Sequence, residues 1–136
     1  MRRPLVRVLL ALLAAAVTFG AVTWVALEGH EVVVLRTRTA AGGMRATRVW
    51  VVDDGGVAWI EAGNRARPFY RDLQADPAVE LVRGGGASRY RAVPVPTDDA
   101  HARLRRLLAA KYGFADRWIN LLVDTSVSVA VRLEPR

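Results

Sequence analysis

Residues 8–27 form an apolar run without a charge or a proline, and this run constrains the chain more than any other feature. At about 1.5 Å of rise per residue, a helix of roughly 20 apolar residues crosses the hydrocarbon core of a bilayer. A core helix of a soluble protein would be shorter and would carry a polar stripe. We therefore predict that residues 1–31 are a membrane anchor and that residues 32–136 form the domain.

The flanks of this run predict its orientation. Arg2, Arg3 and Arg7 precede it, and Trp24 lies near its other end, where an indole favours the headgroup region. The positive-inside rule then predicts a single-pass membrane protein with its N-terminus in the cytoplasm and its domain on the opposite side. Two alternatives stay open, a helix that packs on the domain and a cleaved signal peptide. The run exceeds the usual signal-peptide length of about 7 to 15 apolar residues, and residues 25–27 match a cleavage site poorly.

The amino-acid composition limits which catalytic groups and metal ligands this chain can provide. There is no cysteine, so disulfides, thiolate nucleophiles and Cys-ligated metals are excluded. His30 and His101 have no partner at ligand spacing, and no metal site is predicted. Beyond the anchor, 17 basic residues face 11 acidic ones. Such a surface suits DNA, anionic lipid or a phosphorylated small molecule, although a solvated face near anionic headgroups explains the charge equally well.

Short β-branched runs separated by glycine-bearing turns predict a mainly β domain with some α, in the order β-β-β-α-β-β-α-β. The predicted strands are residues 32–39, 45–52, 57–62, 78–83, 88–95 and 126–133. A short helix is predicted over 68–74, and a longer one is capped by Thr97 and ended by Gly113. Residues 114–123 add helical turns with Phe114, Trp118, Leu121 and Leu122 on one side. The sparse helices favour a mostly antiparallel barrel over a doubly wound sheet.

Common catalytic and nucleic-acid signals are missing. Ser88, Ser126 and Ser128 lack a nucleophile elbow and a partner histidine, so a serine hydrolase is not predicted. The glycines at 84–86 are not followed by the helix of a P-loop and are best explained as a hairpin tip. A basic face without an aromatic platform or a recognition helix does not favour DNA or RNA as a partner.

Arginines gather around the first hairpin and after the third predicted strand. They are Arg36, Arg38, Arg45, Arg48, Arg65, Arg67 and Arg71. In a small barrel several of them can converge on an anion, and the start of the helix at Pro68 adds backbone donors. The alternative, that they fan outward from alternating positions, stays open.

Four segments in a fixed order carry a resemblance to a known family. They are RATRVW at 45–50, AGN at 62–64, PFYRDL at 68–73 and ADPAVEL at 75–81. The last two are similar to an aromatic-Tyr-x-Asn-Leu and an Ala-Asn-Pro-x-Val pattern. Together they resemble the deazaflavin (F420)-dependent nitroreductase-like proteins, within the flavin-reductase split β-barrel group that includes pyridoxamine phosphate oxidases.

This resemblance implies a split β-barrel that binds F420 or FMN, a phosphate-bearing cofactor, and passes hydride to a quinone or nitro compound. Carried over by position, the residues that line its phosphate and ring are Arg45, Thr47, Arg48 and Trp50, and those that close the site are Gly63, Asn64 and Tyr70. No catalytic residue is implied. The family's first hairpin loop usually reads Gly-Arg-Lys-Ser-Gly, whereas residues 40–44 read AAGGM, which leaves the phosphate to Arg45 and Arg48.

Three functional hypotheses follow. The first is a membrane-tethered oxidoreductase whose lipophilic acceptor is concentrated in the bilayer. The second is a non-catalytic module that binds a flavin, haem or lipid-like ligand in the same groove. The third is a structural or partner-binding domain, and here a homodimer is the expected partner because split barrels of this kind commonly pair.

Overall fold

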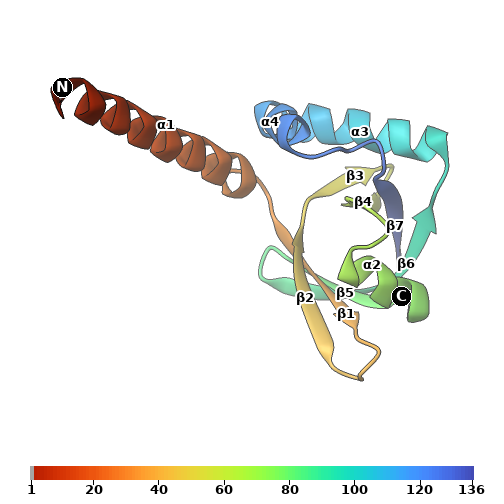
Figure 1. Cartoon of the computed structure of the whole chain (residues 1–136). Helices are drawn as coiled ribbons and strands as arrows, with labels where there is room; N and C mark the ends of the chain where they lie inside the picture. The colour runs from red at the N-terminus through yellow and green to blue at the C-terminus, as the bar shows by residue number, and fades with distance from the viewer. Residues whose placement is uncertain (1) are drawn as a thin grey trace.

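The computed structural model describes residues 2–136 and shows a mainly β domain with helices, preceded by one long helix (Figure 1). The helices are α1 (Arg2–Glu28), α2 (Pro68–Ala75), α3 (Asp98–Tyr112) and α4 (Phe114–Leu122). The strands are β1 (Val33–Arg38), β2 (Met44–Val49), β3 (Val51–Asp54), β4 (Val57–Ala62), β5 (Ala78–Arg83), β6 (Gly86–Val95) and β7 (Val129–Pro135). The predicted fold class and the order of elements are confirmed, with one strand more than predicted.

All strands belong to one antiparallel sheet in the order β2-β1-β5-β6-β7-β4-β3. The extra strand arises because the predicted strand 45–52 divides at Trp50 into β2 and β3. Val49 pairs with Val33 of β1, whereas Val51 pairs with Ile60 of β4, so the chain changes its partner strand within two residues. Because β2 and β3 are the two edges of the sheet, their connection at Trp50 curls the sheet into a half-barrel.

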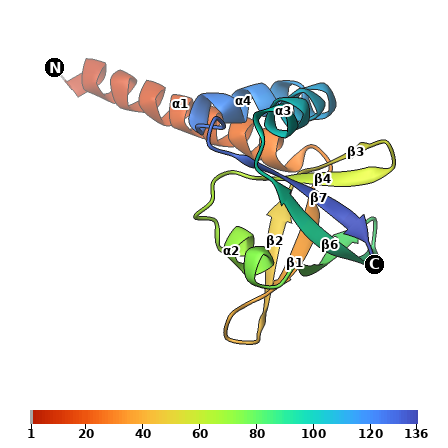
Figure 2. The ribbon, with the colours of Figure 1, turned by 90° about the vertical axis from the view of Figure 1, so that its right-hand side faces the viewer.

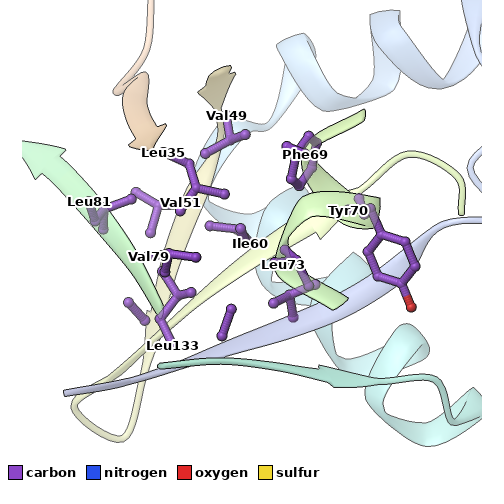
Figure 3. Packing of buried hydrophobic residues seen from close by; sticks show 14 of the residues in the cluster. Leu35, Val49, Val51, Ile60, Phe69, Tyr70, Leu73, Val79, Leu81 and Leu133 are labelled. Carbon is purple, nitrogen blue, oxygen red and sulfur yellow. The ribbon is translucent and has the colours of Figure 1, made fainter. Parts of the chain in front are cut away.

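The core fills the concave face of this sheet. Leu35, Val51, Ile60 and Leu133 are fully buried, and every second residue of β4 points inward. Figure 3 shows these side chains converging from the curled strands, with α2 lying against the same cluster. This alternation of buried and exposed positions is the pattern that the sequence predicts for half-buried strands.

A second apolar cluster lies on the other face of the sheet, beneath α3. Leu104, Leu108 and Tyr112 of α3 pack on Val52 and Ala130 of the sheet. The predicted helix ends are confirmed. The hydroxyl of Thr97 accepts a hydrogen bond from the Ala100 amide at 3.3 Å, and Gly113 ends α3 with a φ of 52°, a value that favours glycine.

The N-terminal helix α1 touches the domain only near its C-terminal end, and the rest projects away from it (Figures 1 and 2). Ala26 is buried, and Trp118 of α4 contacts both Phe19 and Thr23. The segment Pro4–Glu28 is long and apolar enough to cross a membrane, a property that a signal sequence shares. Its most apolar stretch is not covered by the rest of the chain.

Helix α4 differs from its neighbours because several of its large apolar side chains are exposed. Ala115 and Asp116 are its buried residues, whereas Phe114, Leu121 and Leu122 are exposed. Of the predicted apolar side of α4, Phe114, Leu121 and Leu122 are therefore exposed, whereas Trp118 packs against the second apolar cluster and α1.

Candidate functional site

A pocket of about 390 Å³ lies where β2 and β4 meet the end of α1 and the helices α3 and α4. Its lining residues are Leu27, Glu28, Val32, Thr47, Arg48, Val49, Trp50, Glu61, Gly63, Arg67, Phe69, Arg105, Asp116, Ile119, Val123, Asp124 and Thr125. Ligand pockets of small molecules commonly have this size and this mixture of apolar walls with a few polar groups.

Four of the seven predicted cofactor residues line this pocket. Thr47 and Arg48 come from β2, Trp50 occupies the corner between β2 and β3, and Gly63 follows β4. The Trp50 indole stacks on the Tyr112 ring, with 4.3 Å between the ring centroids and 9° between the planes. This stacking fixes an aromatic wall beside the pocket.

The other three predicted residues lie elsewhere. Arg45 donates from its Nε to Asp72 Oδ2 at 2.7 Å, and Tyr70 is buried in the core with its hydroxyl pointing away from the apolar cluster (Figure 3). Asn64 accepts a hydrogen bond from the Ala66 amide at 2.9 Å and lines a second hollow beside α3. None of the three lines the pocket that holds Arg48, and their role as cofactor contacts stays a prediction.

The sequence did not predict a cluster of charged side chains on the pocket wall, formed by Glu61, Arg105 and Asp116. Arg105 Nη1 donates to both carboxylate oxygens of Glu61, at 3.0 and 2.9 Å, while its Nη2 donates to Asp116 at 2.6 Å. Asp116 is almost completely buried, and Glu61 and Arg105 side chains are each 15% exposed. The one signal available was Glu61, the single charge in a strand of apolar residues.

This cluster continues away from the pocket through hydroxyl and imidazole groups. The Ser128 hydroxyl donates to Glu61 Oε1 at 2.6 Å, and His101 Nε2 lies 3.0 Å from the same hydroxyl. The expectation that Ser128 has no partner histidine is therefore wrong. Because every member has a partner, the cluster joins α3, β4, α4 and the residue before β7 as one hydrogen-bonded unit. It therefore holds the pocket wall rigid where helix α4 meets the barrel.

Most of the arginines near the first hairpin are paired with carboxylates rather than gathered on one anion. Arg36 contacts Glu80 at 2.5 Å, Arg38 contacts Asp76 at 3.3 Å, and Arg48 contacts Glu28. Arg67 has no carboxylate within ion-pair distance in the described residues 2–136, and its guanidinium lies beside Gly63. Of the seven arginines that the sequence predicts around an anion, Arg48 and Arg67 are thus the two that line the pocket.

Charged groups also fix the segment that leaves α1. The carboxylate of Glu31 accepts from Arg83 at 2.5 Å and from Lys111, and hydrogen bonds from these two cations hold its pKa below the ordinary value. The Tyr112 hydroxyl donates to the Glu31 carbonyl at 2.8 Å, and burial raises the pKa of this phenol. These contacts tie the exit of α1 to β5 and α3.

The pocket has the features that a planar ring with an anionic tail requires. Trp50, Val49 and Phe69 supply apolar surface, and Arg48 and Arg67 supply guanidinium groups that bind phosphate or carboxylate oxygens in pairs. The residues present therefore fit a cofactor of the F420 or FMN type.

Solved structures share this fold. A conserved hypothetical protein of Mycobacterium tuberculosis has 17% identity and a TM-score of 0.64, covering 86% of this chain and 79% of its own. An F420-H2 dependent reductase, FDR-A, has 17% identity and a TM-score of 0.57, covering 76% of this chain and 93% of its own. A structure described as a domain-swapped dimer has 16% identity and a TM-score of 0.58, covering 76% and 79%. At these identities the likeness is one of fold.

No curated protein matches the sequence. A family model does match, over residues 14–134, and its description is F420H(2)-dependent quinone reductase. The match covers both the domain and the second half of α1. The resemblance to the F420-dependent family is thereby confirmed, and the chain belongs to the F420H(2)-dependent quinone reductase family.

Proposed function

We propose that this protein is an F420H2-dependent reductase that α1 tethers to a membrane and that reduces a quinone dissolved in the bilayer. One observation carries the proposal. In a chain of this family, the pocket that holds Thr47, Arg48, Trp50 and Gly63 is bordered by Leu27 and Glu28, the last turn of the apolar helix. A cofactor in this pocket lies close to the end of the proposed membrane span.

The residues of the pocket have separate roles in this proposal. Trp50 presents an aromatic wall to the deazaflavin ring, while Arg48 and Arg67 hold the anionic tail. F420H2 supplies the hydride when bound. Arg105 holds the Glu61 and Asp116 carboxylates in place, so the chain contributes binding, orientation and a polar wall to the reaction.

Family membership supports F420 as the cofactor in preference to FMN. We also propose that α1 spans a bilayer, that its N-terminus is cytoplasmic and that the hydride acceptor is a quinone. These three proposals rest on α1, whose apolar stretch is not covered by the domain. A homodimer is proposed as the assembly, because one solved relative in fold is a domain-swapped dimer.

The test uses the full chain in lipid nanodiscs. F420 and FMN are titrated separately while intrinsic fluorescence is followed, and F420H2 oxidation is then measured with a quinone in the bilayer. We expect saturable F420 binding and quinone-dependent oxidation. If neither cofactor binds, the proposal is rejected. If only FMN binds, F420 is rejected as the cofactor.

A further inference from the structure

Helix α4 exposes an apolar face that the domain does not use. Phe114 is 54% exposed, Leu121 is 79% exposed and Leu122 is 46% exposed. Val123, just after the helix, is 43% exposed. Single exposed apolar residues are normal on a protein, but a cluster on one short helix marks a contact surface.

The contacts of α4 indicate what covers this face. Trp118 packs on Phe19 of α1, with 5.6 Å between the ring centroids, and its Nε1 donates to Thr23 at 3.0 Å. The exposed face of α4 therefore continues the apolar surface of α1. Figures 1 and 2 show the rest of α1 running outward from this contact.

The position along α1 at which α4 makes contact sets the level of α4 relative to the bilayer. From Arg7 to Trp24 a helix rises about 25 Å, close to the thickness of the hydrocarbon core, which places Thr23 and Trp24 at the membrane surface. Trp24 is 67% exposed, as an interfacial tryptophan requires. Because α4 touches α1 at Thr23, it lies at the same level.

Helix α4 also has the composition of an interfacial helix. Arg117 and Asn120 are exposed beside the apolar residues, while Asp116 is turned into the domain and neutralised by Arg105. A short helix with this division rests at the boundary between headgroups and acyl chains. The Arg117 guanidinium is available there to lipid phosphates.

We propose that the apolar face of α4, formed by Phe114, Leu121 and Leu122, is a second membrane contact that seats the domain on the bilayer. The pocket is bordered by Ile119 and Val123 of the α4 segment and by Leu27 of α1. Its mouth therefore opens at the membrane surface, and a bilayer-dissolved quinone enters it laterally without crossing water. The membrane contact rests on the membrane tether of the proposed function, and the entry route rests also on its quinone reaction.

The contact is tested directly by label depth. The chain has no cysteine, so Leu121→Cys provides a single attachment site for an environment-sensitive fluorophore. The labelled full chain is placed in vesicles of phosphatidylcholine and phosphatidylglycerol that contain lipids with a quencher near the headgroup. We expect strong quenching. The matched control is Ala41→Cys, in the loop between β1 and β2 at the opposite end of the domain (Figures 1 and 2).

Equal, weak quenching at both positions would overturn the proposal. Energy transfer between copies labelled at Leu121, without lipid quenching, would overturn it in favour of a protein interface. Either result is independent of enzyme activity.

The entry route is tested with Phe114→Ser combined with Leu121→Ser, since neither residue lines the pocket. We expect kcat/KM for a long-chain quinone in the bilayer to fall by about tenfold or more. Turnover of a short-chain, water-soluble quinone should be unchanged. Met44→Ser, an exposed apolar residue outside α4, is the control. An equal loss with both quinones would reject lateral entry, and no turnover by the unaltered chain would reject the proposed function while leaving the label result valid.

Discussion

Two buried carboxylates, Asp72 and Asp116, are held by arginines at different places in this barrel and have different roles. At α2, Asp72 accepts from Arg45 at 2.7 Å and from the Thr37 hydroxyl at 2.9 Å. At α4, Asp116 and Glu61 share Arg105. The first cluster joins helix α2 to the first hairpin, whereas the second forms a wall of the pocket.

The comparison shows that the side chains around an arginine in space, and not its position in a sequence motif, decide its role. Arg45 and Arg48 are three residues apart on the same strand, and the family resemblance gives both to the cofactor. Arg45 is drawn to Asp72 of α2, away from the pocket, whereas Arg48 lines the pocket. Four predictions test this contrast, from the largest expected effect to the smallest.

The largest effect is expected for Arg105→Ala. It leaves Glu61 and Asp116 buried without their cation, and breaking such a buried pair costs about 3 to 5 kcal/mol. The free energy of unfolding, measured with denaturant at neutral pH, should fall by that amount. Arg105→Lys is the control and should lose less, because it keeps the charge. An unchanged unfolding free energy would show that the cluster does not hold α4 to the barrel.

Arg48→Ala should weaken F420 binding by about 1.5 to 3 kcal/mol, the value of a charge-assisted hydrogen bond. Arg45→Ala is the matched variant, and because Arg45 is paired with Asp72 outside the pocket we expect its F420 affinity to be close to that of the unaltered chain. Fluorescence titration measures both. Equal losses would favour the residue assignment that the family resemblance implies.

Asp72→Asn should reduce the unfolding free energy by about 1 to 2 kcal/mol without changing cofactor affinity. Burial raises the pKa of Asp72, but hydrogen bonds from Arg45 and Thr37 outweigh it and hold the pKa below its ordinary value of 3.8. The stability from this carboxylate is therefore present above pH 3.8 and is lost as the pH falls through the folded-state pKa. In the Asp72→Asn variant, the unfolding free energy should fall less steeply as the pH is lowered. An unchanged pH dependence would mean that other groups cause the loss of stability in acid.

The smallest effect is expected for Arg103→Ala. Arg103 contacts Asp54 at 2.6 Å, but its side chain is 62% exposed. Solvent-exposed pairs contribute less than about 1 kcal/mol. Thermal unfolding in low and high salt should show little change. A loss as large as that of Arg105→Ala would mean that burial is not what separates the two kinds of pair.

The sequence predicts this barrel well because its signals are local. Alternating β-branched residues, the glycine-bearing turns and the Thr97 cap depend on neighbours within a few positions. The division at Trp50 was missed because β2 and β3 look like one continuous strand. Only the pairing of Val49 with β1 and Val51 with β4 separates them.

Four of the predicted cofactor residues line one pocket, and their role as cofactor contacts stays a prediction. Thr47, Arg48, Trp50 and Gly63 lie in ordered segments next to glycines or strand ends, and the resemblance located them. Arg105 and Asp116 lie on helices that the sequence marks as amphipathic but cannot orient. Their meeting with Glu61 joins residues that are 44 and 55 positions apart from it, which local patterns do not encode.

The sequence alone determined the apolar helix, the mainly β domain, the helix caps and, through its motifs, the F420-dependent family, since each is written in short-range spacing and composition. The tertiary structure decided which arginines are neutralised, which face of α4 is exposed and which residues meet in the pocket. These outcomes follow from the curl of the sheet, because that curl brings β2, β4 and the end of α1 against α4.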